Sequence, residues 1–251
     1  LRPDGTSPFS QDGICIHRGL GVAGFSELTI VPDAGVVKLD PDIPLDIACV
    51  IGCAVQTGVG AVFNSARVEV GSTVFVTGLG GIGISIVQGA RIAGAGKIIV
   101  SDPVAERREA AIHFGATYTI NPDEDEVIPK VLEETKAIGV DYAFEAAGVA
   151  SLVDTCINAS RIGGTTVIVG ADASLSTVQI LPVLIATMGK KIIGSLLGDC
   201  HPQRDIPNFV NLWKSGQLDL EAMISHRVKL EEINSGFQNV RETNGIRTVV
   251  E

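Results

Sequence analysis

Short runs of β-branched and other apolar residues alternate, from residue 73 onward, with longer stretches whose apolar residues recur at helical spacing. The apolar runs predict strands at residues 73–78, 97–102, 118–120, 141–147, 165–170 and 191–196. The longer stretches predict helices at residues 81–94, 104–115, 124–138 and 149–160. Because repeated strand–helix units place their strands parallel, this pattern predicts an α/β fold with a doubly wound parallel sheet, the Rossmann arrangement.

The flanking residues follow a different pattern. Residues 1–50 contain short strand-like pieces broken by glycine and proline, which indicates irregular β structure. In the tail, the segments PNFVNLWKSGQ and EEINSGFQNVRE predict helices, and IRTVVE predicts a closing strand. We therefore expect a Rossmann domain over residues 55–196, with residues 1–54 and 197–251 belonging to a second, incomplete module.

A glycine-rich turn follows the first expected strand and opens the first expected helix. The segment GLGGIG matches G-x-G-x-x-G and contains Gly78, Gly80, Gly81 and Gly83. Glycines in this pattern permit a tight turn, close approach of a pyrophosphate and close packing of helix on strand. The helix N-terminus then offers free N–H groups to the phosphates. We interpret the segment as a dinucleotide site; a plain strand-to-helix turn is the alternative.

An aspartate ends the second expected strand. Asp102 lies about 20 residues beyond the last glycine, where a carboxylate accepts hydrogen bonds from an adenosine ribose. A carboxylate there repels a 2′-phosphate, so NAD is favoured over NADP. Arg107, one turn into the next helix, is a second candidate for the ribose contact, and a solvated helix face is its alternative.

Composition narrows the class of partner. A net charge of −10 disfavours binding to nucleic acid or to an anionic membrane surface. Polar residues and glycines interrupt the longest apolar region, residues 74–100, so we expect no membrane span there. The five cysteines show no paired spacing, which fits reduced thiols in a cytoplasmic protein.

Several segments, in order along the chain, resemble the medium-chain zinc-dependent alcohol dehydrogenases. They are IGCAVQTGVGA, TGLGGIG, FEAAG, VIVGA and the closing GIRTVVE. The resemblance implies a Rossmann domain flanked by parts of a GroES-like, β-rich catalytic domain. It also implies zinc-assisted interconversion of a small-molecule alcohol and an aldehyde or ketone, with NAD as hydride carrier. Several subgroups share these motifs, including class III-like, glutathione-dependent formaldehyde dehydrogenases.

The resemblance assigns further roles to individual positions. Thr57 matches a residue near the nicotinamide, and Ile82 one that packs on the coenzyme. Val169 and Leu197 match residues on the nicotinamide side, and Arg247 matches the arginine that pairs with the pyrophosphate. Core packing is the alternative for Ile82, Val169 and Leu197. A surface ion pair is the alternative for Arg247.

Cys53 resembles the third protein ligand of the family's catalytic zinc. One thiolate cannot make such a site, which takes three protein ligands and a water. The family's other two ligand motifs and its four-cysteine structural-zinc lobe do not occur in these residues. Zinc is therefore expected only if further ligands precede this sequence.

Three hypotheses follow. In the first, which we favour, the chain is part of a complete NAD-dependent dehydrogenase. In the second, it is a redox-inactive NAD-binding or assembly protein without catalytic zinc. A zinc-free quinone reductase of the same superfamily fits less well, because Cys53 is retained and Asp102 favours NAD.

The resemblance also implies assembly. The family usually dimerises by pairing its last Rossmann strand across a two-fold axis, and here that strand is residues 191–196. Its apolar sequence, KIIGSL, is compatible with such pairing, because an open strand edge is a liability. We expect a homodimer or tetramer.

Overall fold

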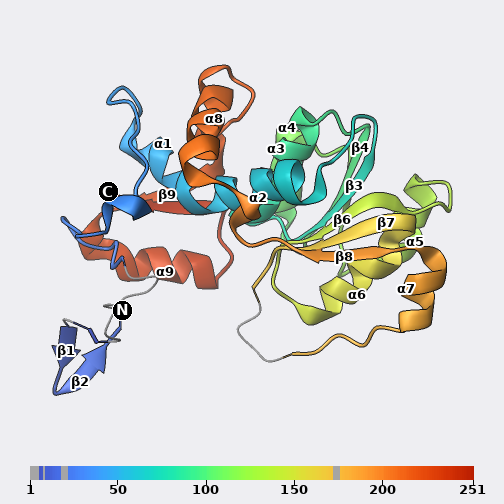
Figure 1. Ribbon diagram of the computed structural model, residues 1–251, viewed down its shortest axis with the longest axis horizontal. Helices are drawn as coiled ribbons and strands as arrows, with labels where there is room; N and C mark the ends of the chain where they lie inside the picture. The colour runs from blue at the N-terminus through green and yellow to red at the C-terminus, as the bar shows by residue number, and fades with distance from the viewer. Residues whose placement is uncertain (1–5, 8, 18–21, 172–175) are drawn as a thin grey trace.

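A six-stranded parallel sheet forms one side of the molecule, on the right in Figure 1. The computed structural model describes residues 6–7, 9–17, 22–171 and 176–251. The strands are β3 (Thr73–Thr77), β4 (Lys97–Ser101), β5 (Tyr118–Ile120), β6 (Val140–Glu145), β7 (Ser160–Ile168) and β8 (Lys191–Gly194). Their order across the sheet is β5-β4-β3-β6-β7-β8. The chain adds strands on one side of β3 up to β5 and then on the other side from β6, so the strand order reverses between β3 and β6. The expected Rossmann fold is confirmed, and ligands bind such sheets at the carboxyl ends near the reversal.

Helices cover both faces of the sheet. The long runs that predicted helices form α3 (Gly81–Ile92), α4 (Ala105–Phe114), α5 (Val127–Glu134) and α6 (Ala150–Ala159). In β3, Val74 and Val76 pack with α3 and α4, whereas Phe75 packs with α5 and α6, and all three side chains are fully buried. A strand buried on both faces reads as an unbroken apolar run, which is why these strands were recognisable.

One helical run crosses the expected domain boundary at residues 54 and 55. It comprises α1 (Leu45–Val50), η3 (Ile51–Val55), α2 (Gln56–Gly60) and η4 (Ala61–Ala66), and η3 and η4 are π-helical. By length and composition this run is apolar enough to cross a membrane. However, Val55, Val59 and Val62 are fully buried in the core, which accounts for its composition. The sequence analysis had placed no helix here.

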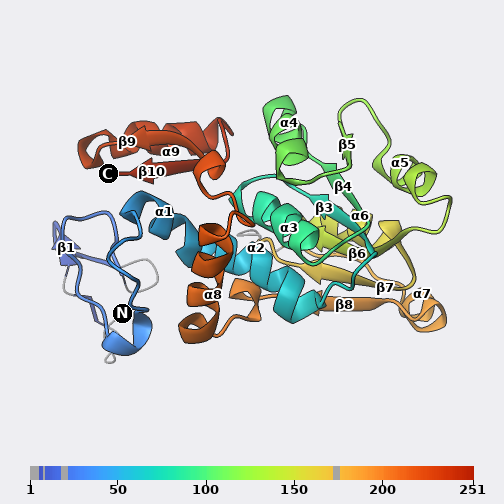
Figure 2. The same cartoon turned by 90° about the horizontal axis from the view of Figure 1, so that it is seen from above.

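The remaining elements form a lobe beside the sheet (Figures 1 and 2). Its elements are β1 (Phe9–Gln11), β2 (Ile14–Ile16), η2 (Asp33–Gly35), η5 (Leu197–Asp199), α8 (Pro202–Lys214), η6 (Glu221–Met223), β9 (Ile224–Val228), η7 (Leu230–Glu232), α9 (Ile233–Arg241) and β10 (Arg247–Val250). The two expected tail helices and the closing strand are confirmed. The sequence analysis missed β9, which pairs in parallel with β10, and α7 (Pro182–Met188) before β8. The assignment of this lobe to a GroES-like domain stays a prediction.

Candidate functional site

The glycine turn lies at the carboxyl end of β3, beside the reversal of the sheet. Gly78 has a left-handed backbone (φ +84°), which favours glycine. A Cβ on Gly83 would lie 1.8 Å from the carbonyl oxygen of Gly78, so the helix approaches the strand too closely for any side chain. In contrast, a Cβ on Gly80 would meet no atom of the described residues within 4 Å. The turn is therefore tightly packed on its inner side and open at Gly80, where an incoming group has room.

Arg247, from β10, reaches the first residue of α3. A Cβ on Gly81 would lie 2.0 Å from its Nε and 2.5 Å from its Nη2, so the guanidinium lies directly on the turn. The Nε atom is buried and has no hydrogen-bond partner among the residues that the structure describes. Burial holds the pKa of Arg247 below its usual range. A buried N–H donor without a partner is costly, and an anion at the N-terminus of α3 would accept its hydrogen bond.

No side chain caps the N-terminus of α3, because Gly80 occupies that position. The first N–H groups of a helix have no partner within the helix and carry a partial positive charge. Together with Arg247, they form a cradle whose charge and open space fit a pyrophosphate. The described residues at this turn therefore fit the pyrophosphate of a dinucleotide.

Asp102 and Arg107 both form hydrogen bonds with backbone groups near this cradle. The Asp102 carboxylate, 4% exposed, accepts the N–H of Leu79 at 2.7 Å and the N–H of Val104 at 2.8 Å. It thereby ties the glycine turn to the end of β4, a role that the sequence analysis missed. A carboxylate has about four acceptor positions, so a ribose hydroxyl can still be accommodated. Arg107 Nε donates to the carbonyl of Gly245 at 3.0 Å, so it lies on no free solvated face.

Glu145, at the end of β6, was not singled out by the sequence analysis. Its side chain is buried, and its Oε1 accepts the N–H groups of Ala147, Gly148 and Val149 at 2.9, 2.8 and 3.2 Å. Its Oε2 has no partner among the described residues. Ala147 in turn packs on the glycine turn, 2.8 Å from where a Cβ on Gly78 would lie. Glu145 therefore shapes the wall beside the turn.

The segment after β7 continues this wall. Val169, 9% exposed, donates its N–H to the carbonyl of Glu145 at 2.9 Å. The backbone at Gly170 packs tightly on Gly148, because a Cβ on Gly170 would lie 2.1 Å from the nitrogen of Gly148. The core-packing alternative for Val169 fits this burial, and its outward contact with a coenzyme stays a prediction.

The segment after β8 has an unusual backbone. Three consecutive residues are left-handed: Leu197 (φ 49°), Gly198 (φ 69°) and Asp199 (φ 47°). This region is natural for glycine, whereas it costs a leucine roughly 1–2 kcal/mol. The Leu197 side chain is 47% exposed, so it does not belong to the core. Core packing does not explain Leu197, and contacts outside the segment must hold its backbone.

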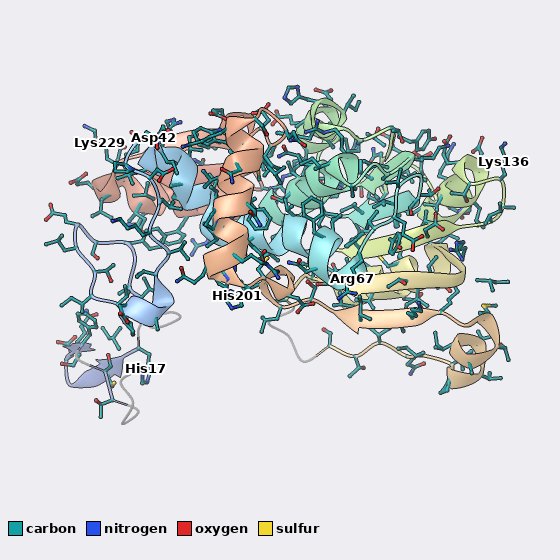
Figure 3. The ribbon with its side chains drawn as sticks, turned by 45° about the horizontal axis from the view of Figure 1, so that its top comes forward. His17, Asp42, Arg67, Lys136, His201 and Lys229 are labelled. Atoms are coloured by element: carbon teal, nitrogen blue, oxygen red, sulfur yellow. The ribbon has the colours of Figure 1, made fainter. Side chains whose placement is uncertain are left out.

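Cys53 is exposed and lies beside Arg247 along a cavity of about 120 Å³. Thr57, one turn further along the helical run, is buried. No group of three or more histidine, cysteine, aspartate or glutamate side chains able to hold a metal occurs within the described ranges. Figure 3 shows two histidines, His17 and His201, on separate parts of the molecule. These residues alone do not fit a zinc ion, and Cys53 supplies at most one ligand.

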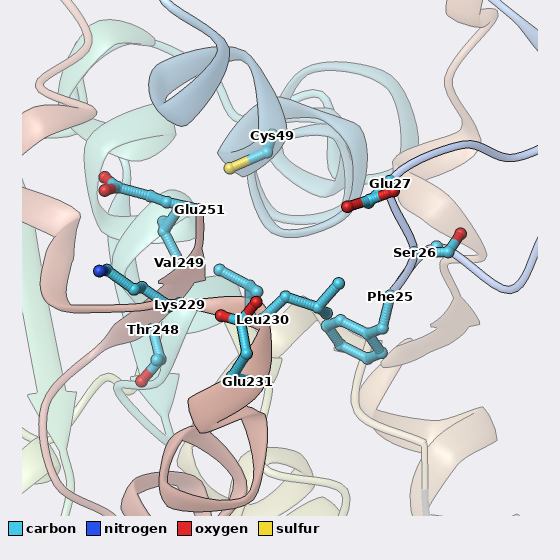
Figure 4. Close-up of a pocket in the computed structure, with 12 residues that line it drawn as sticks. Phe25, Ser26, Glu27, Cys49, Lys229, Leu230, Glu231, Thr248, Val249 and Glu251 are labelled. Carbon is cyan, nitrogen blue, oxygen red and sulfur yellow. The ribbon is translucent and has the colours of Figure 1, made fainter.

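A larger cavity, of about 690 Å³, lies in the flanking lobe (Figure 4). Phe25, Cys49 and Lys229 are among the residues that line it, and no residue of the glycine turn is among them. The cradle at the turn and this cavity are therefore distinct.

Comparison with known proteins identifies relatives over the whole chain. Residues 81–215 match the family model described as zinc-binding dehydrogenase. The chain is 37% identical over 259 residues to the class-3 alcohol dehydrogenase of Cereibacter sphaeroides, of which it spans 69%. Its structure resembles benzyl alcohol dehydrogenase from Acinetobacter calcoaceticus, with a TM-score of 0.82 and 29% identity, covering 85% of this chain and 59% of that one. It also resembles a zinc-binding dehydrogenase from Sinorhizobium meliloti 1021 bound to NADP, with a TM-score of 0.73 and 29% identity, covering 80% of this chain and 58% of that one.

Proposed function

This chain belongs to the zinc-binding dehydrogenase family, and on that premise we propose that it binds NAD for an oxidoreductase that interconverts an alcohol and an aldehyde or ketone. One observation carries the proposal: the buried, unpartnered Nε of Arg247 lies on the glycine turn at the uncapped start of α3. An anionic pyrophosphate would supply the missing partner and bind the free N–H groups.

The sheet order then sets the direction of the cofactor. With the pyrophosphate over the end of β3, the adenosine half extends toward β4 and Asp102, and the nicotinamide half extends toward β6, β7 and β8. NAD, when bound, supplies the ring that accepts or donates a hydride. This chain's residues hold that ring: Ile82 from the turn, Val169 after β7, Leu197 after β8, and Thr57 from the helical run.

We propose NAD rather than NADP because Asp102 is a buried carboxylate at the end of β4. A 2′-phosphate placed there would meet a like charge in a poorly solvated site. The relative bound to NADP makes this choice worth measuring directly.

We propose Cys53 as one ligand of a catalytic zinc, on family resemblance and on its exposure beside Arg247. The other ligands would have to come from residues that do not form a cluster in the described ranges. Zinc content measured on the purified protein tests this. A protein with NAD affinity and no zinc would favour the redox-inactive NAD-binding alternative.

We also propose a homodimer or tetramer formed through the edge strand at residues 191–196. Large apolar side chains beside that edge support it: Leu181, Val183 and Leu184, on and next to α7, are 65%, 63% and 44% exposed. An exposed apolar cluster next to an open strand commonly marks an interface. The family relationship and the unpaired cysteines support a cytoplasmic location.

Titration calorimetry with NAD and NADP tests the proposal. We expect saturable NAD binding and NADP binding at least about tenfold weaker, because like charges at the ribose oppose the 2′-phosphate. Asp102→Asn keeps an acceptor for Leu79 and removes the charge, so it should narrow the preference for NAD. An unchanged NAD-to-NADP ratio in this variant would remove Asp102 from the ribose site. The absence of any binding to the wild type would refute the proposed function.

A further inference from the structure

We infer that Asn64 and Ser65, at the end of the long helical run, are positioning residues that hold segment 195–199 in the shape that receives the nicotinamide half of the cofactor. The inference rests on the proposed function, because it concerns the same binding site. It adds a pair of residues that belong to η4 and contribute no part of the G-x-G-x-x-G pattern.

Segment 195–199 lies where the sheet order places the nicotinamide half. It follows β8 directly, and the N–H of Ser195 donates to the carbonyl of Ile168 at the end of β7 at 2.9 Å. The carboxyl ends of β7 and β8 therefore carry this segment beside the wall formed by Glu145 and Val169. A dinucleotide anchored at the glycine turn reaches this edge with the half that points away from Asp102.

Two neighbouring side chains on η4 bind the segment. Asn64 Nδ2 donates to the carbonyl of Gly198 at 3.1 Å. Ser65 Oγ donates to Asp199 Oδ2 at 2.6 Å and lies 2.8 Å from the hydroxyl oxygen of Ser195. These contacts reach the first and last residues of the segment and Gly198, so they lie on both sides of Leu197.

Close packing between the helical run and residues 198–200 supports the same placement of the segment. A Cβ on Gly198 would lie 2.3 Å from the carbonyl oxygen of Gln56, and a Cβ on Gly60 would lie 2.4 Å from Cys200 Sγ. The Cys200 thiol donates to the carbonyl of Gln56 at 3.3 Å, and burial raises its pKa to about 12, so it keeps its proton. The helical run and the segment thus pack too closely at Gly60 and Gly198 for any side chain there.

The backbone of the segment explains why such a clamp is needed. Leucine disfavours the left-handed region that Leu197 occupies, and Asp199 adopts the same region two residues later. Without the bonds from Asn64 and Ser65, the segment would populate other conformations. The cofactor would then have to select the competent one, which weakens its apparent affinity by the fraction that is lost.

Calorimetry with two ligands isolates this effect. NAD occupies both halves of the site, whereas AMP occupies only the adenosine half near β4. We expect Ser65→Ala to weaken NAD binding about fivefold to tenfold and to change AMP binding less than about twofold. Ser65→Thr, which keeps the hydroxyl, should restore NAD binding. Asn158→Ala is the control, because among the described residues the Asn158 side chain bonds only Asp154, on the exposed surface of α6. This variant should bind both ligands as the wild type does.

Hydrogen exchange on the free protein supplies a second readout that needs no ligand. Amides of residues 195–200 should exchange faster in Ser65→Ala than in the wild type, while amides of α3 should not change. NAD binding by Ser65→Ala equal to the wild type would overturn the inference. Equal loss of NAD and AMP binding would also overturn it, because that result indicates general destabilisation. If the wild type binds neither ligand, the proposed function fails and the inference falls with it.

Discussion

The glycine turn after β3 and the segment after β8 both bring left-handed backbone to the edge of the sheet, but they do so in opposite ways. In the turn, the left-handed residue is Gly78, and the sequence itself permits the conformation. In the segment, Leu197 adopts it against its own preference. Bonds from a helix about 130 residues earlier reach Ser195, Gly198 and Asp199 around it. One half of the proposed cofactor site is thus encoded locally, and the other depends on tertiary contacts.

We expect the largest loss of stability from a substitution in the glycine turn. Gly83→Ala places a methyl group 1.8 Å from the carbonyl oxygen of Gly78, so α3 must move off β3. We expect a loss of about 3 kcal/mol or more in the free energy of unfolding, measured by urea denaturation.

Gly80→Ala is the matched control for this clash. A Cβ there meets nothing within 4 Å among the described residues, so we expect wild-type stability. The methyl group would instead fill the space left for the pyrophosphate and weaken NAD binding. If Gly83→Ala is as stable as Gly80→Ala, the close packing of the turn is not what requires glycine.

In the segment after β8, introducing a glycine should stabilise the protein, whereas removing Gly83 from the turn should destabilise it. Leu197→Gly removes the cost of a left-handed leucine, and because the leucine side chain is 47% exposed, little packing is lost. We expect the free energy of unfolding to rise by about 1 kcal/mol. Thermal denaturation followed by circular dichroism measures this. A clear loss of stability would mean that the Leu197 side chain holds the segment, contrary to the comparison drawn here.

The same contrast explains what the sequence predicted. The six strands, their helices and the turn at Gly78 follow from runs, periodicity and glycine placement within a few residues. Asp102 and Arg247, which the sequence singled out, both lie at the turn, and their contacts with a cofactor stay predictions. These features are local or are carried by short motifs.

The helical run at residues 45–66 was missed for a physical reason. Gly52, Gly58 and Gly60 lower its intrinsic helix propensity, so the sequence reads as irregular. Two of these glycines are required by tertiary packing: a Cβ on Gly58 would lie 2.5 Å from the carbonyl oxygen of Ile82, and one on Gly60 would meet Gly198 and Cys200. Packing against partners far along the chain decided the structure there.

Site residues were missed for a similar reason. Glu145 lies in the segment FEAAG that carried the family resemblance. Its structural role depends on three backbone N–H groups that only the folded turn presents to its carboxylate. Asn64 and Ser65 read as ordinary polar residues in a segment where the sequence predicted no helix. No local pattern connects them to residues 195–199, so only the structure reveals the contacts.

The central claim is that the Nε of Arg247, which has no hydrogen-bond partner among the described residues, lies on the glycine turn and binds an anionic cofactor. Arg247→Met tests this claim most directly. Methionine keeps the length of the side chain and removes the charge. We predict that calorimetry will find NAD binding about 10- to 100-fold weaker than in the wild type. The free energy of unfolding should equal or exceed that of the wild type, because the variant lacks the buried Nε that has no partner among the described residues. Unchanged NAD affinity in a folded variant would contradict the account.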